Sequence, residues 1–355
     1  MKSRYYALGA LLLAVVVVLG GGAWVVGANT FGYDEQRVTI PVTDALAAGG
    51  SAPDAHTGGR LDGLLTTPKG SSGPHGLVVM VHGDGAANAT RDDGYKPLSE
   101  AFAKAGFATL AWNKAGVDGS PGNWLQQSLA DRGAEVAAAL DWARGRPDID
   151  RSRIGAWGVS QAGWVLPEIS ARRPDIRFLI LVGAAVNWLR QGEYNTLAEL
   201  RAAGASEEDR TRALDRRAAS VALLRQGADY GTYLASTVDD PPMSADRWGF
   251  VERNFRADVT PAIPAIAVPT LLILGDADRN VDVDETARAY EAGMRPGLLT
   301  EHRFPGATHS ITRDDIEYRA DELTVAARAI FAPRSIYAPG YLDLLTRFTQ
   351  QQGAR

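Results

Sequence analysis

Short apolar runs alternate with segments of helical spacing along most of the chain. The runs are typical of strands buried on both faces of a parallel sheet, and they fall at residues 77–81, 107–112, 154–157, 178–182 and 269–274. Apolar side chains recur at helical spacing at 95–105, 129–144, 162–171, 284–293 and 313–331, with a further strand at 299–304 and a short last helix at 341–349. This alternation predicts an α/β fold, a mostly parallel sheet with helices on both faces.

Two regions depart from this alternation. Residues 36–42 and 60–67 read as two strands of an antiparallel hairpin at one edge of the sheet. Residues 187–263 contain no convincing strand and carry charged amphipathic segments, at 196–203 and 206–226. We therefore expect one domain over residues 32–355, into which residues 187–263 are inserted as a helical cap over the end of the sheet.

The first 31 residues read as a membrane segment. Lys2 and Arg4 precede an uncharged run from residue 5 to residue 31, and this run is long enough to span a bilayer, which takes roughly 20 apolar residues. The positive charges before the run place the rest of the chain outside the cytoplasm. Small residues at 26–28 would suit a signal peptidase, so a signal anchor and a cleaved signal peptide both remain open. The protein would be membrane-anchored, or secreted if the segment is cleaved.

Composition narrows the chemistry. The chain has 355 residues, of which 45% are apolar, so it can bury a large core. The net charge of -5 gives no reason to expect nucleic acid as a partner. The absence of cysteine excludes disulfides, a thiol nucleophile and thiolate metal sites. The five histidines are too scattered for a zinc site, and there is no phosphate-binding glycine loop, so we expect no metal and no organic cofactor.

Candidate chemistry centres on Ser160. The pentapeptide Gly158-Val159-Ser160-Gln161-Ala162 directly follows the strand predicted at 154–157. A serine between small residues at a strand-to-helix turn is a nucleophile elbow, which exposes the hydroxyl and leaves the next backbone N–H free for an oxyanion. Ala162 stands where the usual pattern has glycine, and Gly163 follows at once.

A serine hydroxyl needs a base within hydrogen-bond reach, and His309 is the best candidate. It lies in a loop between the last strand and the last long helix, where a base can approach the serine. The other histidines lie in polar loops before the sheet, within a strand, or at a glycine turn: His56, His75, His302 and His82.

The base in turn needs a carboxylate to orient it. Gly275-Asp276-Ala277-Asp278 follows the strand predicted at 269–274. We prefer Asp278, because it lies far enough past the strand to swing towards the histidine. Asp276 is the next candidate, although a role in stabilising the turn suits it better, and Asp282 and Asp284 remain as further alternatives.

The order Ser160, Asp278, His309 is that of the α/β-hydrolases. The chain resembles bacterial extracytoplasmic serine hydrolases of this superfamily, in the serine aminopeptidase and dienelactone-hydrolase-like branches, over about residues 60–331. The motifs that carry the resemblance are residues 81–85 with 91–94, 112–117, 153–161 and 275–278. The resemblance implies an α/β-hydrolase fold, and an oxyanion hole in which the backbone N–H of Asp84, or of Gly85, is paired with that of Gln161.

The predicted function is cleavage of a carboxylic ester through an acyl-enzyme intermediate. Trp188, Tyr233 and Trp248 of the cap could line an acyl pocket, and packing inside the cap is the alternative for them. A peptidase of the aminopeptidase type and a thioesterase or lactonase remain open, as does an inactive membrane-tethered binding module. The expected partners are a small ester or short peptide and, through the N-terminal segment, a membrane. The oligomeric state stays open.

Overall fold

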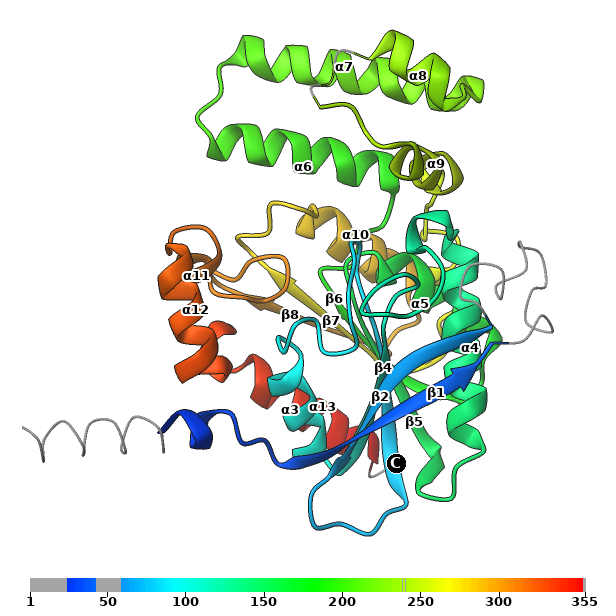
Figure 1. Cartoon of the computed structure of the whole chain (residues 1–355), viewed down its shortest axis with the longest axis vertical. Coiled ribbons are helices and arrows are strands. Elements are labelled where there is room, and N and C mark those ends of the chain that lie inside the picture. The colour runs from blue at the N-terminus through cyan, green and yellow to red at the C-terminus, as the bar shows by residue number, and fades with distance from the viewer. Residues whose placement is uncertain (1–23, 43–58, 238, 240, 354–355) are drawn as a thin grey trace, which may run out of the picture.

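A computed structural model describes residues 24–42, 59–237, 239 and 241–353, and an eight-stranded sheet forms its centre (Figure 1). The strands are β1 (Tyr33–Pro41), β2 (Arg60–Pro68), β3 (His75–Val81), β4 (Phe107–Trp112), β5 (Ile149–Val159), β6 (Ile176–Val182), β7 (Thr270–Gly275) and β8 (Leu299–Phe304). They are ordered β1-β2-β4-β3-β5-β6-β7-β8. The hairpin β1–β2 is antiparallel and pairs antiparallel with β4, and the other pairings are parallel. The α/β fold and the edge hairpin are as predicted.

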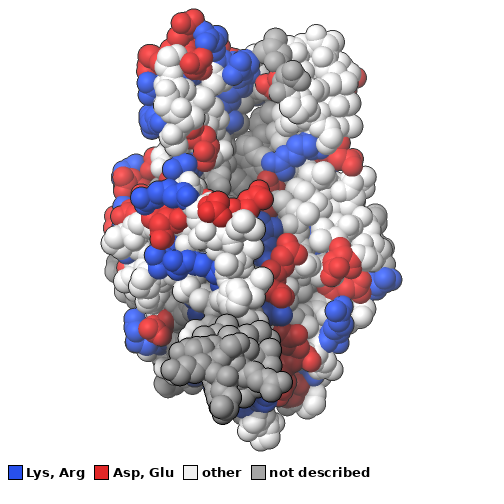
Figure 2. All heavy atoms as spheres, turned by 60° about the vertical axis from the view of Figure 1, so that its left-hand side comes forward, with Lys and Arg blue, Asp and Glu red and all other residues white. Residues whose placement is uncertain are grey.

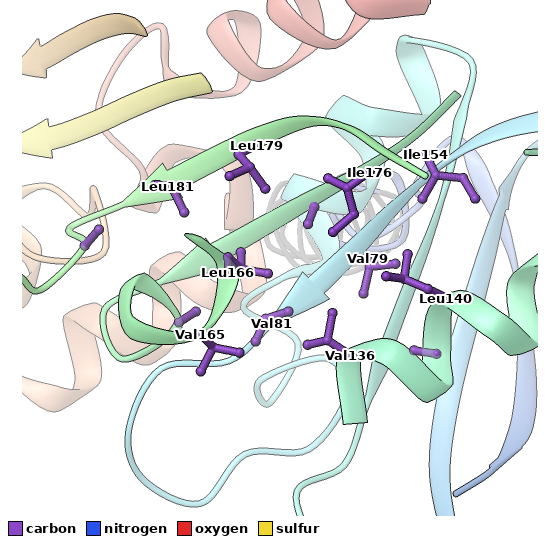
Figure 3. Packing of buried hydrophobic residues seen from close by; sticks show 14 of the residues in the cluster. Val79, Val81, Val136, Leu140, Ile154, Val165, Leu166, Ile176, Leu179 and Leu181 are labelled. Atoms are coloured by element: carbon purple, nitrogen blue, oxygen red, sulfur yellow. The ribbon is translucent and has the colours of Figure 1, made fainter. Parts of the chain in front are cut away.

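Helices cover both faces of the sheet because successive side chains of each buried strand point to opposite sides. In β3, Val79 and Val81 pack with α4 (Leu129–Arg144) and α5 (Ala162–Arg172) (Figure 3). The same core includes side chains of α10 (Val283–Gly293). Val78 and Met80 point to the other face, which is covered by α3 (Lys96–Lys104) and α13 (Tyr341–Gly353). All seven residues of β3 are buried. Residues 77–81 of β3 are all apolar, as burial on both faces at the centre of this sheet requires.

The helical insertion lies between β6 and β7 and forms a separate layer above the sheet (Figure 1). It contains α6 (Trp188–Ala202), α7 (Glu207–Gln226), α8 (Tyr230–Ser236) and α9 (Ala245–Asn254). Ser206 begins α7 with a capping box, in which its hydroxyl accepts from the N–H of Asp209 and the Asp209 carboxylate accepts from the N–H of Ser206. The insertion has a small core of its own around Leu224, Trp248 and Phe255. The predicted cap is thus present as helices, and α6 begins at Trp188 rather than at residue 196.

One predicted helix is wrong. The helix expected over 313–331 is divided into α11 (Asp314–Glu317) and α12 (Glu322–Phe331). Asp321 starts a new helix there, since its carboxylate accepts from the backbone N–H of Thr324 and caps α12. Single turns of 3-10 helix complete the secondary structure: η2 (Trp124–Gln126), η3 (Ile263–Ala265) and η4 (Pro333–Ile336).

The predicted membrane segment falls mainly on residues 1–23, which lie outside the described residues. Residues 24–28 are helical. Of the helices that the structure describes, none has the length and apolar character needed to cross a membrane.

Candidate active site

Ser160 stands at the sharp turn between β5 and α5. Its φ of +58° lies in the left-handed region, which is strained for a residue with a side chain. Its backbone N–H donates to the carbonyl of Val182 over 2.9 Å, which ties the turn to β6. Gly158 makes the turn possible, because a Cβ there would lie 2.6 Å from the Cβ of Ala162 and 2.6 Å from Cδ1 of Leu166. This is the strand-to-helix geometry that the pentapeptide predicted.

His309 and Asp278 come from the loops after β8 and β7 and form a buried pair. Nδ1 of His309 lies 2.8 Å from Oδ2 of Asp278. The other carboxylate oxygen of Asp278 accepts the backbone N–H groups of Asn280 at 2.6 Å and Val281 at 2.9 Å. With both oxygens engaged, the carboxylate can hold the imidazole in one orientation.

The alternative carboxylates bind other groups of the chain. Asp276 accepts the backbone N–H of Gly306 at 2.5 Å, which fits its expected role in stabilising the turn. Asp282 caps the start of α10, and Asp284 forms a surface ion pair with Arg303. Among the candidate carboxylates only Asp278 contacts His309.

The environment of His309 favours its protonated form. Burial lowers the pKa of the imidazole, but the charge of Asp278, the hydrogen bond that Nδ1–H donates to it and the charge of Glu317 outweigh burial and raise the pKa above 6.5. Nε2 of His309 is buried and has no hydrogen-bond partner within the described part of the chain. The imidazole ring packs closely against Gly183, where an added Cβ would lie 2.9 Å from Nδ1 of His309. The free nitrogen and Ser160 line the same cavity.

The turn after β3 lies directly against the serine. A Cβ at Gly83 would lie 3.0 Å from the Cβ of Ser160. The backbone N–H groups of Asp84 and Gln161 donate no hydrogen bond to any other described residue. Both groups remain open for a substrate oxygen.

The carboxylate of Asp84 is held by two partners on either side of the turn. It forms an ion pair with Arg247 of α9 at 2.9 Å and accepts from Nε2 of Gln161 at 3.2 Å. Partial burial would raise the pKa of this carboxyl, but the hydrogen bond and charge of Arg247, the charge of Lys114 and the N–H of Gly85 together lower it. Asp84 is therefore ionised at neutral pH.

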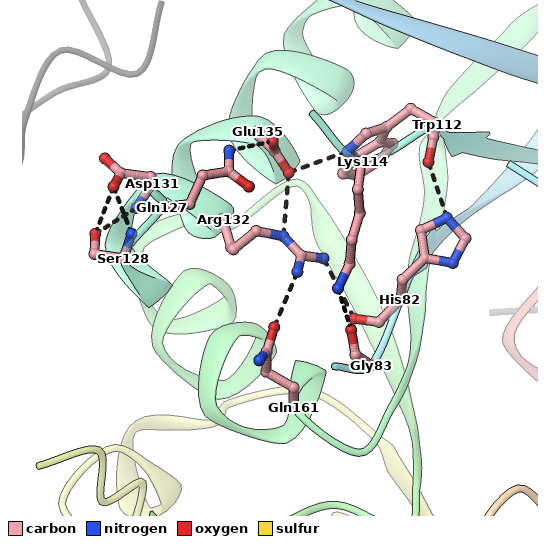
Figure 4. A network of polar contacts seen from close by, with 10 residues as sticks. All are labelled: His82, Gly83, Trp112, Lys114, Gln127, Ser128, Asp131, Arg132, Glu135 and Gln161. Atoms are coloured by element: carbon pink, nitrogen blue, oxygen red, sulfur yellow. Dashed lines mark hydrogen bonds and ion pairs between the residues drawn. The ribbon is translucent and has the colours of Figure 1, made fainter. Parts of the chain in front are cut away.

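A buried polar network behind this turn has no counterpart in the sequence predictions (Figure 4). Nζ of Lys114 donates to the carbonyl of Gly83 over 2.5 Å, and Arg132 donates to the carbonyl of His82 over 3.3 Å and to Oε1 of Gln161 over 3.0 Å. Glu135 accepts from Nε of Arg132 over 3.2 Å. Burial and the charge of Arg132 lower the pKa of Lys114 well below its usual value.

His82 belongs to this network rather than to the serine. Its Nε2 lies 2.8 Å from the carbonyl of Trp112. Burial, with the charges of Lys114 and Arg132, lowers the pKa of the imidazole to about 3, so the ring is neutral. This agrees with the prediction that His82 shapes the turn.

A cavity of about 990 Å³ lies between the sheet and the helical insertion. It is lined by Ser160, His309, Gln161, Asp84, Gly85 and Trp188, among others.

Tyr233 and Trp248, predicted for the acyl pocket, do not line this cavity. Their rings stack on each other at 4.3 Å and lie in the core of the insertion, with exposed fractions of 0% and 1%. Their place is set by packing inside the cap, so these two predictions are wrong. No group of three or more potential metal-ligating side chains is found within the described ranges.

A family model described as serine aminopeptidase, S33, matches residues 72–316. An uncharacterised protein of Mycobacterium tuberculosis is 30% identical over 180 residues, which are 48% of this chain and 59% of that protein. An uncharacterised 31.7 kDa protein of Escherichia coli is 31% identical over 109 residues, 30% of this chain and 36% of that protein. The chain therefore matches less than two thirds of the length of these relatives.

Solved structures show the same fold at low sequence identity. Fungal esterases of Rhizomucor miehei align with a TM-score of 0.53 and 15% identity, covering 96% of this chain and 90% of that one. Est1E of Butyrivibrio proteoclasticus with ferulic acid bound aligns with a TM-score of 0.51 and 17% identity, covering 85% and 99%. An acylaminoacyl peptidase of Pyrococcus horikoshii aligns with a TM-score of 0.51 and 13% identity, covering 90% and 42%. At these identities the likeness concerns the fold alone.

Proposed function

Since this chain belongs to the serine aminopeptidase S33 family of α/β-hydrolases, we propose that it cleaves carboxylic esters through an acyl-enzyme intermediate. The observation that carries the proposal is the convergence of three features on one cavity. They are the strained turn at Ser160, the free Nε2 of His309 backed by Asp278, and two unengaged backbone N–H groups.

In the proposed reaction, Oγ of Ser160 attacks the ester carbonyl while Nε2 of His309 takes its proton. Asp278 holds Nδ1 of the ring and stabilises the imidazolium. The backbone N–H groups of Gln161 and Asp84 stabilise the negative oxygen of the tetrahedral intermediate. Gly85, the alternative to Asp84, fits this role less well, because its N–H is directed to the Asp84 carboxylate. His309 then protonates the leaving alcohol. A water molecule repeats the sequence on the acyl-enzyme and releases the acid.

The acids around the cavity favour an ester over an aminopeptidase substrate. A peptide N-terminus carries an ammonium group, which needs a free carboxylate. Asp84 is paired with Arg247, Glu317 accepts from the hydroxyl of Thr308, and Asp239 accepts from the hydroxyl of Tyr233. Each described acid of the lining is thus directed to a neighbouring side chain, although only Asp84 is paired with a cation, and the lining also contains apolar side chains, Trp164, Trp188 and Leu189.

The test compares Ser160→Ala with the wild type on 4-nitrophenyl butyrate and on alanine 4-nitroanilide. We expect the substitution to lower kcat on the ester by on the order of 10⁴-fold or more. Ser120→Ala is the matched control, because Ser120 is buried, donates to Asp62 and lies outside the cavity lining.

Three results are informative. Equal rates for wild type and Ser160→Ala would refute the serine mechanism and leave an inactive binding module. A preference for the anilide would replace the esterase proposal with a peptidase. Labelling of the wild type but not of Ser160→Ala by a fluorophosphonate would support Ser160 as the nucleophile.

We also propose an extracytoplasmic location, on the evidence of residues 1–31 alone. A protease added to intact cells should then degrade the domain if the segment remains an anchor, and the protein should be found in the medium if the segment is cleaved. Protection until the cells are lysed would contradict both.

A further inference from the structure

Four arginines line the cavity: Arg91, Arg216, Arg217 and Arg247. Within the described part of the chain only Arg247 has a carboxylate partner, Asp84. The described carboxylates of the lining are three, Asp84, Asp239 and Glu317, against these four arginines. The cavity therefore carries more positive charge than its own walls neutralise. Figure 2 shows the hollow between the helical insertion and the body, with basic side chains in blue beside it.

Arg217 is the most firmly placed of these cations. It is half-buried on α7, and its Nη2 donates to the carbonyl of Leu189 over 2.6 Å. A Cβ at Gly192 of α6 would lie 2.7 Å from Nη2 and 2.8 Å from Nη1 of Arg217. The guanidinium thus lies close over Gly192 of α6, where an added side chain would force it to shift.

The glycine at position 192 lowers the stability of α6. A glycine in the middle of a helix destabilises it by roughly 0.5–1 kcal/mol relative to alanine. Burial also lowers the pKa of Arg217, and the charge of Glu193 opposes this only in part. One of the five N–H donors of the guanidinium is used by Leu189, so several remain for a ligand. A partly dehydrated cation with open donors is stabilised when an anion binds beside it.

The rest of the wall indicates what such an anion is attached to. Apolar side chains, Trp188, Leu189 and Val221, line the same cavity as Ser160 and Arg217. A ligand that fills this space has a carbonyl at the serine, an apolar middle and a negative end.

We propose that the substrate is an ester with an anionic group on its acyl or alcohol chain, a carboxylate in the first instance, and that Arg217 binds this group with Arg216 beside it. This inference rests on the proposed function, because it concerns the same cavity. It also separates this chain from an aminopeptidase, whose cationic substrate these arginines would repel.

The experiment measures kcat/KM for mono-4-nitrophenyl adipate and suberate, each compared with its methyl-capped diester. We expect the wild type to prefer the free carboxylate about tenfold, the range of a hydrogen bond to a charged group. Arg217→Gln should lower this preference about tenfold, and Arg217→Lys should restore part of it.

Arg225→Gln is the matched control. Arg225 is exposed on the same helix and lies outside the cavity lining, so the same chemical change there should leave the preference unaltered. Equal kcat/KM for acid and methyl ester in the wild type, or equal preferences in Arg217→Gln and Arg225→Gln, would overturn the inference. Hydrolysis of the neutral esters that depends on Ser160 would still stand in that case, so the two proposals can fail separately.

Discussion

Replacing Gly183 by alanine tests whether His309 must sit where the structure holds it. Gly183 follows β6 with a φ of +50°, and an added Cβ would lie 2.7 Å from the carbonyl oxygen and 2.9 Å from Nδ1 of His309. An ordinary contact of this kind is about 3.4 Å or more, so the histidine must move by roughly half an ångström or more. The strain of a left-handed alanine adds about 1–2 kcal/mol to the cost in stability.

The effect on catalysis should exceed the effect on folding. A misplacement of about 1 Å can cost on the order of 10²-fold in rate, so we expect kcat for Gly183→Ala to fall about 10- to 100-fold. The movement also acts on the 2.8 Å contact between His309 and Asp278. The assay is hydrolysis of 4-nitrophenyl butyrate, with urea unfolding measured on the same preparation.

Gly297→Ala is the control that separates the backbone strain of a left-handed alanine from the displacement of His309. Gly297 has a φ of +83°, and an added Cβ there meets nothing within 4 Å. Both variants should therefore lose stability from the left-handed alanine, but only Gly183→Ala should lose activity. If the two variants have the same kcat, the position of His309 does not limit the reaction, and the assignment of the base is wrong.

Two further predictions concern charge near the site. The base must be neutral, so kcat/KM should rise with pH through a pKa above 6.5. Asp278→Asn should move this rise to lower pH and reduce kcat by on the order of 10⁴-fold. If the rise stays at the same pH in the variant, Asp278 does not act on the base. Lys114→Met leaves the carbonyl of Gly83 without its donor, so kcat should fall about tenfold with a smaller change in KM, whereas the exposed Lys69→Met should change neither. A rise in KM alone would assign Lys114 to substrate binding instead.

Strand positions could be predicted because each buried strand is an apolar run with a clear end. The bounds of β4 and α4 agree with the prediction, and the chain marks the start of each, with Gly106 in the left-handed region before β4 and Ser128 capping α4. The break between α11 and α12 was missed because apolar spacing continues across it. A single capping carboxylate at Asp321 decides that break, and its effect is local.

The serine, acid and base could be proposed from sequence because each follows a parallel strand. The carboxyl ends of parallel strands meet at one edge of the sheet, so residues far apart in the chain arrive together. Aromatic residues of the cap carry no such information. A ring that lines a cavity and a ring that packs in a core are both apolar, and only the stacking of Tyr233 on Trp248 separates the two roles.

The buried cations could not be predicted, because charge in a sequence usually indicates the surface. Lys114 follows β4, and Arg132 lies in the first turn of an otherwise alanine-rich helix. Nothing in their spacing places them behind residues 82–83. In the buried network Lys114 donates to the carbonyl of Gly83, and Arg132 donates to the carbonyl of His82 and to Glu135.

A contact with the cap explains why an acidic residue is tolerated at position 84. A carboxylate beside a developing oxyanion would oppose catalysis if its charge faced the substrate. Here Arg247 of the cap and the amide of Gln161 bind that charge, while the backbone N–H of Asp84 stays unengaged. Both members of the ion pair are about one third exposed or more, so the pair adds little stability, about 0–1 kcal/mol. Its effect is on orientation: the helices that shape the substrate cavity also hold the turn that would stabilise the oxyanion, so a displacement of α9 would change specificity and rate together.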